Sequence, residues 1–131
     1  MRRVICVVLC MFAAHHAFAA TFEQQLLKLD FEERADQVCV KLGVETIRKG
    51  GQLPGADRLM TGISGRAVVK GNVVSAAHAA VRTNVKSKSH WYKLKFDCEV
   101  SDDHVKGLSF KYEIGPEIPS EEWADLGLWQ H

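Results

Sequence analysis

The segment from 91 to 100 constrains the fold most, because apolar and polar residues alternate in it. One series, which we expect to face the core, consists of Tyr92, Leu94, Phe96, Cys98 and Val100. The other series begins with Trp91 and continues with charged residues. A period of two places successive side chains on opposite faces of a strand. The segment therefore predicts a half-buried strand with the first series inward.

A partner strand is expected after the polar turn at 101–103, running as far as Ile114. Its predicted inward residues are Leu108, Phe110, Tyr112 and Ile114. Val105 is out of phase with these four residues, so we expect a β-bulge at Gly107. The two segments together predict an antiparallel hairpin.

A helix is predicted to follow Asp30, which is a good N-cap residue with Glu33 three positions later. Apolar residues then recur at steps of three and four, as on one face of a helix, and include Cys39. Gly50 and Gly51 predict its end. Residues 22–29 suggest a short helical lead-in.

The rest of the chain predicts short strands and one more helix. Strands are expected at 58–63, 66–69, 73–77 and 79–85, with a tight turn at 70–72 and a polar loop at 86–89. A short C-terminal helix is expected from Ser120 to Gly127. The chain is 47% hydrophobic and has 17 basic and 16 acidic residues, as in a globular domain. We predict an α+β fold, with an N-terminal helix packed on an antiparallel sheet of about four to six strands.

The first 19 residues have the pattern of a secretory signal peptide. Arg2 and Arg3 precede an apolar run at 4–14, and Ala17 and Ala19 stand where a signal peptidase requires small residues. Cleavage after Ala19 would leave one mature domain, residues 20–131. The expected location is the periplasm or the external medium.

Export changes the interpretation of the four cysteines. Cys6 and Cys10 would be removed with the signal peptide, which leaves Cys39 and Cys98 in an oxidising compartment. We expect these two to form one disulfide. The alternative, a catalytic thiol or a metal pair, has less support, because neither cysteine has a Cys-x-x-Cys partner or a histidine at ligand spacing.

A set of residues spread over nearly all of the mature chain has a distinctive order and spacing. It comprises Leu29, Asp30, Glu33, Arg34, Gln37 and Cys39, then Val69 to Asn72, then Trp91, Tyr92, Leu94, Phe96 and Cys98, then Asp103, His104, Phe110, Tyr112, Ile114 and Gly115, and finally Ile118, Pro119, Trp123, Leu128 and Trp129. In these residues the chain resembles a bacterial family known as domain of unknown function 930. Phe31 departs from it, since a proline would be expected there. The family has no established activity. The resemblance implies an exported, disulfide-bearing envelope protein.

No motif predicts catalysis, a cofactor or a metal. Ser64 in Gly62–Gly65 lacks the spacing of a nucleophile elbow. An acidic turn containing Asp102, Asp103 and His104 would hold a divalent cation with Asp97, but aspartate also favours turns for local reasons. Glu121 and Glu122 suit the first turn of a helix.

The predicted outward face of the hairpin is the candidate binding surface. Its residues are Trp91, Lys93, Lys95 and Lys111, with His90 beside them. If Cys98 pairs with Leu108, Lys95 lies opposite Lys111, and opposed like charges reduce stability. Such a surface suits an anionic partner. The alternative is an ordinary solvated strand face whose lysines prevent edge aggregation.

These observations predict a class of function rather than an activity. We expect a non-catalytic module that binds an envelope component or a protein partner. The alternatives are a small envelope hydrolase and an inhibitor of a wall-degrading enzyme. A net charge of +1 disfavours nucleic acid as a partner. No apolar run reaches the roughly 18 residues that stable membrane insertion needs.

Overall fold

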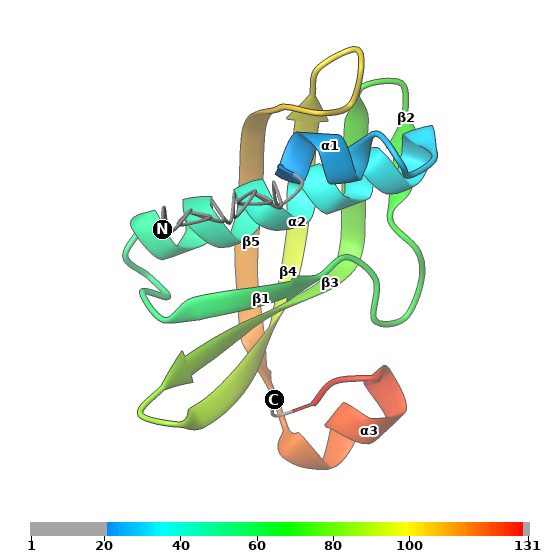
Figure 1. The fold of residues 1–131 in the computed structure, drawn as a ribbon. Helices are drawn as coiled ribbons and strands as arrows, with labels where there is room; N and C mark the ends of the chain where they lie inside the picture. Colours follow the sequence, from blue (N-terminus) through cyan, green and yellow to red (C-terminus); the bar gives the residue numbers. More distant parts are fainter. Residues whose placement is uncertain (1–20, 130–131) are drawn as a thin grey trace, which may run out of the picture.

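The computed structural model describes residues 21–129 and shows an α+β fold, with a helix lying across a five-stranded antiparallel sheet (Figure 1). The helices are α1 (Phe22–Leu26), α2 (Phe31–Lys49) and α3 (Trp123–Leu126), and the 3₁₀ turn η1 (Ser120–Glu122) precedes α3. The strands are β1 (Ala56–Met60), β2 (Val68–Lys70), β3 (Val73–Val85), β4 (Lys88–Val100) and β5 (Gly107–Ile118). The predicted signal peptide, its cleavage residues Ala17 and Ala19, and Cys6 and Cys10 lie outside the described residues.

Helix α2 begins and ends where the sequence predicts. The Asp30 carboxylate accepts a hydrogen bond from the Glu33 N–H at 2.9 Å, which caps the first turn. Gly51 follows the helix with φ of +82°, a conformation that glycine adopts readily. The short lead-in is α1, so the principal helix is the second one and starts at Phe31.

The sheet has the order β1-β3-β4-β5, and β2 pairs with the beginning of β3. The strands expected at 73–77 and 79–85 are one strand, β3, because Ala77 and His78 form a bulge that shifts the alternation without ending the ladder. The loop expected at 86–89 is a two-residue turn. Lys86 and Ser87 both have positive φ there, 51° and 62°, as hairpin turns of the primed type require.

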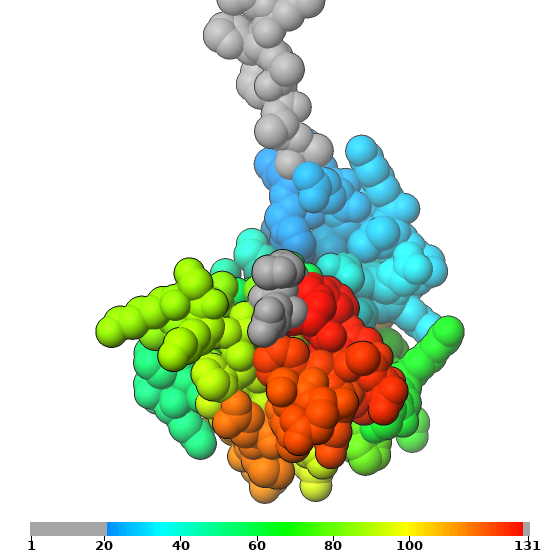
Figure 2. Space-filling model, turned by 90° about the horizontal axis from the view of Figure 1, so that it is seen from below, coloured from blue at the N-terminus to red at the C-terminus, as the bar shows by residue number. Residues whose placement is uncertain are grey.

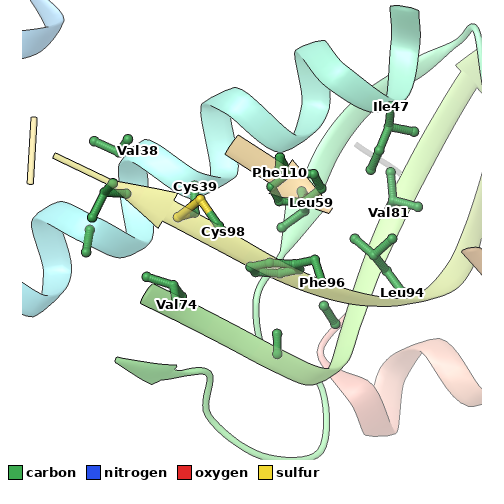
Figure 3. Packing of buried hydrophobic residues seen from close by; sticks show 14 of the residues in the cluster. Val38, Cys39, Ile47, Leu59, Val74, Val81, Leu94, Phe96, Cys98 and Phe110 are labelled. Atoms are coloured by element: carbon green, nitrogen blue, oxygen red, sulfur yellow. A yellow bond between two sulfur atoms is a disulfide. The ribbon is translucent and has the colours of Figure 1, made fainter. Parts of the chain in front are cut away.

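The inner face of the sheet packs under α2 and carries the predicted disulfide (Figure 3). Cys39 of α2 bonds to Cys98 of β4, and their Cα atoms are 6.0 Å apart. Around it lies a core that includes Val38, Ile47, Leu59, Val74, Val81, Leu94, Phe96 and Phe110. Helix and sheet are therefore joined covalently at the centre of their contact.

A second, smaller core lies on the outer face of the sheet and corrects the prediction for Trp91. It consists of Ala80, Trp91, Ile118, Trp123 and Leu128. Trp91 is fully buried, because η1, α3 and the following residues fold over this end of the face. Figure 2 shows the C-terminal segment, orange to red, spread over this end of the molecule. The indole Nε1 of Trp91 donates to the Trp129 carbonyl at 3.0 Å.

A bidentate ion pair lies beside this second core. Arg82, which is 5% exposed, binds both carboxylate oxygens of Asp57 at 2.8 and 2.9 Å. The guanidinium donates to the charged carboxylate and holds the pKa of Asp57 below its usual range, while the pKa of Arg82 is raised. The pair links β1 to β3 on the outer face.

The register of the β4–β5 hairpin differs from the predicted one by two residues. Cys98 lies opposite Phe110, Lys95 opposite Glu113 and Asp97 opposite Lys111. Opposite charges therefore face each other, and the expected opposition of Lys95 and Lys111 was wrong. The predicted bulge is present near Gly107, and it turns Leu108 outward, where it is 61% exposed.

A buried histidine joins three parts of the fold that are distant in the sequence. His104 is 1% exposed and stacks on Phe31 with ring centroids 3.6 Å apart. Its Nδ1 lies 2.7 Å from the Phe31 carbonyl oxygen and its Nε2 lies 2.9 Å from the Gly71 carbonyl oxygen. The loop before β5 is thus attached to the start of α2 and to the β2–β3 turn.

We expect His104→Ala to lower the free energy of unfolding by about 2–3 kcal/mol, because it removes a buried, stacked ring together with its hydrogen bonding to the backbone. Denaturant unfolding followed by circular dichroism measures the change. His90→Ala is the control, since His90 is exposed and contacts only the exposed Glu117 among the described partners. Equal losses for the two variants would contradict the role given to His104.

Candidate functional site

Two β-bulges, one in each of the strands that flank β4, shape a hollow on the outer face of the sheet. In β3, Ala77 and His78 together lie opposite Lys95, and in β5, Gly115 and Pro116 lie opposite Lys93. A Cβ added to Gly115 would be 3.1 Å from the Lys93 Cβ, so glycine allows β5 to approach this lysine closely. Bulges bend strands and redirect side chains, and they are frequent next to functional sites.

The hollow has a volume of about 490 Å³ and lies beside η1 and α3, which contribute Glu122 and Leu126 to its lining. The loop after β1 closes one side, and the Ile63 N–H donates to the His78 carbonyl at 2.9 Å. Apolar groups supply part of the wall, from Ile63, Ala77, Ala79, Leu94, Pro116 and Leu126. The polar lining consists of Ser64, His78, Lys93, Lys95, Glu113 and Glu122.

Lys93 and Lys95 provide the positive charge of this hollow. Both side chains are exposed and project from the same face of β4. Among residues 21–129, neither ammonium group has a carboxylate oxygen within the 4.0 Å that defines an ion pair. An apolar hollow with a few converging polar groups is the usual form of a ligand site. These two cations are free to meet an anionic ligand.

The structure brings together only part of the predicted binding face. Lys111 lies on the same face but outside the hollow, opposite Asp97. His90 lies an odd number of residues from Lys93, so strand alternation places it toward the other face, and its Nδ1 contacts the Glu117 carboxylate at 2.5 Å. Trp91 is buried under the C-terminal segment. The site therefore retains Lys93 and Lys95 and loses Trp91 and His90.

The acidic turn that we considered as a cation site is held by hydrogen bonds within the protein. The Asn72 amide donates to Asp102 at 2.5 Å, and Ser101 donates to Asp103 at 2.6 Å. This bond to Ser101 is the main cause of a lowered pKa of Asp103. The His104 ring is turned inward, and its two nitrogens contact the carbonyl oxygens of Phe31 and Gly71. Within the part of the chain that the structure describes, no three His, Cys, Asp or Glu side chains are placed to hold a metal ion.

Sequence reasoning missed His78, Ser64, Glu113 and Glu122 as members of one site. They come from β3, the loop after β1, β5 and η1. Only the Gly115–Pro116 pair, which interrupts an alternating segment, signals an irregular strand at this place.

None of the helices within residues 21–129 has the length and apolar character that a membrane crossing requires.

Comparison with known proteins places the chain in a family. Neither a curated protein nor a solved structure matches it. A family model described as "Domain of Unknown Function (DUF930)" matches residues 26–128, from the end of α1 to the residues after α3. The match thus covers α2, the disulfide and the whole sheet, and the chain belongs to the DUF930 family.

Proposed function

We propose that this protein is an exported, non-catalytic binding module whose outer-face hollow holds a carboxylate-bearing component of the cell envelope. The observation that carries the proposal is the pair of unpaired lysines, Lys93 and Lys95, in a hollow shaped by two bulges. Each ammonium group offers a charge-assisted hydrogen bond to a carboxylate. The disulfide supports the export part of the proposal, because such bonds persist in oxidising compartments.

The other side chains in the hollow narrow the ligand class. Glu113 and Glu122 bring negative charge close to the two lysines, and Leu126 and Ile63 add apolar surface. This mixture suits a small ligand that has carboxylates, an amino group and methyl groups together. The stem peptides of peptidoglycan have this chemistry, and we propose them as the ligand.

The test is titration of the protein with muropeptides released from peptidoglycan, followed by calorimetry. We expect Lys93→Gln and Lys95→Gln each to weaken binding about tenfold, which corresponds to about 1.4 kcal/mol per lost charge-assisted contact. Lys111→Gln is the matched control, since this lysine lies on the same face but does not line the hollow. Its affinity should stay within about twofold of the original.

Two results would contradict the proposal. One is the absence of binding by the unaltered protein at millimolar muropeptide. The other is an equal loss of affinity in all three lysine variants, which would indicate a diffuse electrostatic effect. Retention of a muramidase or protease by the protein, with no affinity for muropeptides, would support the inhibitor alternative instead.

A hydrolase is the second candidate, because the same hollow contains Ser64, His78 and Glu122. A serine, a histidine and a carboxylate are the group types that nucleophilic hydrolysis uses. The assay is release of soluble products from peptidoglycan, followed by chromatography. Turnover that disappears in His78→Ala and Ser64→Ala would replace the binding proposal with an enzymatic one.

A further inference from the structure

A long groove lies on the other side of the molecule, between helix α2 and the edge of the sheet. Two adjoining hollows form it, with volumes of about 750 and 670 Å³. They share Asp36, Gln37, Thr61 and Gly62, so they are continuous. Figure 1 shows β1 running alongside α2, with the loop after β1 extending outward. None of the lysines of the outer-face hollow lines this groove.

Strand β1 is the edge of the sheet at this groove. It pairs with β3 on one side, and no other strand of the described residues pairs with it. Arg48 of α2 donates to the Ala56 carbonyl at 3.0 Å and covers the first residue of the edge. The remaining residues, 57–60, present backbone groups that an added strand would satisfy. Val40, Val44 and Met60 supply apolar contacts in the groove.

The charges along the groove are separated into two halves. The acidic half, near α1, contains Glu32, Glu33 and Asp36 with a single cation, Arg66. The basic half, near the end of α2, contains Arg48 and Arg58 with Glu45. Lys41 also lines this half, but its ammonium group lies on the α1 side, 4.4 Å from the centre of the Phe22 ring. Asp57 also lines the basic half, but Arg82 neutralises it. Trp129 lies at this end, 42% exposed, with the Arg58 guanidinium 5.3 Å from its ring centre.

We infer that this groove binds an extended segment of a partner protein, which adds to the edge of β1 as an antiparallel strand. The segment carries a basic residue near its beginning, against Asp36 and Glu33, and an acidic residue near its end, against Arg48 and Arg58. Addition of a strand to a sheet edge beside a helix is a recurrent mode of peptide recognition. The direction of β1 sets the order of these charges. β1 runs from the basic half toward the acidic half, so an antiparallel segment begins at the acidic half and ends at the basic half.

Asp36 supports this polarity. It lies where the two halves meet and is hydrogen-bonded to Thr61, and its burial raises its pKa. Partial burial removes solvation from this carboxylate and disfavours its charged form, which a nearby cation would stabilise. A lysine or arginine of the partner would supply that cation. The charged Asp36 carboxylate therefore destabilises the free protein, and a bound cation would offset this effect.

The length of the groove sets the length of the partner segment. Helix α2 has 19 residues, which corresponds to about 28 Å at about 1.5 Å per residue. An extended chain covers this distance with about eight residues. The probes are two peptides with blocked ends and identical composition, Lys-Thr-Val-Thr-Val-Thr-Val-Glu and its reverse, Glu-Val-Thr-Val-Thr-Val-Thr-Lys.

The experiment measures fluorescence anisotropy of each labelled peptide with the protein, and amide hydrogen exchange of β1 in the complex. We expect the lysine-first peptide to bind about tenfold more tightly than its reverse, and to slow exchange of amides in 57–60. Asp36→Asn should remove most of this preference, since it removes the charge and keeps the shape. Asp125→Asn is the matched control and should keep the preference, since Asp125 is an exposed residue of α3 that does not line the groove.

Equal affinity of the two peptides would overturn the inference, and so would protection of amides outside β1. Slow exchange, in the peptide-free protein, of the β1 amides that point away from β3 would also overturn it. Light scattering would then assign the occupant, either to a second copy of the chain if the protein is dimeric or to another segment of the same chain if it is monomeric. None of these results depends on the lysines of the outer-face hollow.

Discussion

Replacement of Trp91 with alanine is expected to lower the free energy of unfolding by about 3–5 kcal/mol, the range for large aromatic residues in cores. Trp91 has no exposed surface and packs against Ala80, Ile118 and Trp123. The change would leave a cavity between the sheet and the C-terminal segment. It would also leave the Trp129 carbonyl without its indole donor. Urea unfolding followed by circular dichroism measures the loss.

Trp129→Ala is the matched control for this prediction. Trp129 contacts Trp91 edge-on, with ring centres 6.4 Å apart, but is 42% exposed. Its removal should cost about 1 kcal/mol, because an exposed ring loses less burial. A stable Trp91→Ala protein with altered binding would instead support an exposed Trp91 on a binding face. That result would contradict the second core.

Removal of the disulfide is expected to have an effect of similar size. Cys39 and Cys98 are 59 residues apart, and closing such a loop restricts the unfolded chain by about 4 kcal/mol at 25 °C. The double variant Cys39→Ala, Cys98→Ala should lose this amount without leaving a reactive thiol. The measurement is the melting temperature with and without a reducing agent.

The reducing agent supplies the control. Wild-type protein should melt at a lower temperature when it is reduced, whereas the double alanine variant should be insensitive to reduction. Single Cys39→Ser protein should expose one alkylatable thiol, Cys98. Free thiols at both Cys39 and Cys98 in the untreated wild type, together with unchanged melting, would refute the bond.

Elements with a local signal could be predicted from the sequence. Helix α2 has a cap at Asp30, a glycine stop and a regular apolar face, and the structure confirms it. The β4–β5 hairpin has uninterrupted alternation over most of its length. The disulfide was predicted from the two cysteines that would remain after export, and the structure confirms it, with Cys39 and Cys98 on facing sides of α2 and β4.

The errors have two physical causes, and the first is that a period of two tells which residues share a face but not what covers that face. Trp91 was placed outward correctly, but the C-terminal segment covers it there. The apolar run Ala79 to Val81 in β3 was a partial signal, because a strand covered on both faces loses its alternation, and the structure buries Ala79 to Thr83. The second is that the hairpin register depended on the irregular loop before β5, where His104 has φ of +58°.

The candidate site was half predictable for the same reason. The placement of Lys93 and Lys95 on one outward face can be predicted from the alternation in β4 alone. The other side chains of the hollow meet them only because two bulges and the path of the C-terminal segment bring four chain segments together. Those contacts are tertiary, and no local pattern specifies them.

The central claim is that the outer-face hollow is the ligand site, and amide NMR spectra with added muropeptide test it most directly. The account predicts changes in amide chemical shift that saturate as muropeptide is added. They should occur around the bulges, in residues 77–79, 93–95 and 113–116, and should disappear in the Lys93→Gln, Lys95→Gln protein. Shifts confined to other surfaces, or unchanged in that variant, would contradict it.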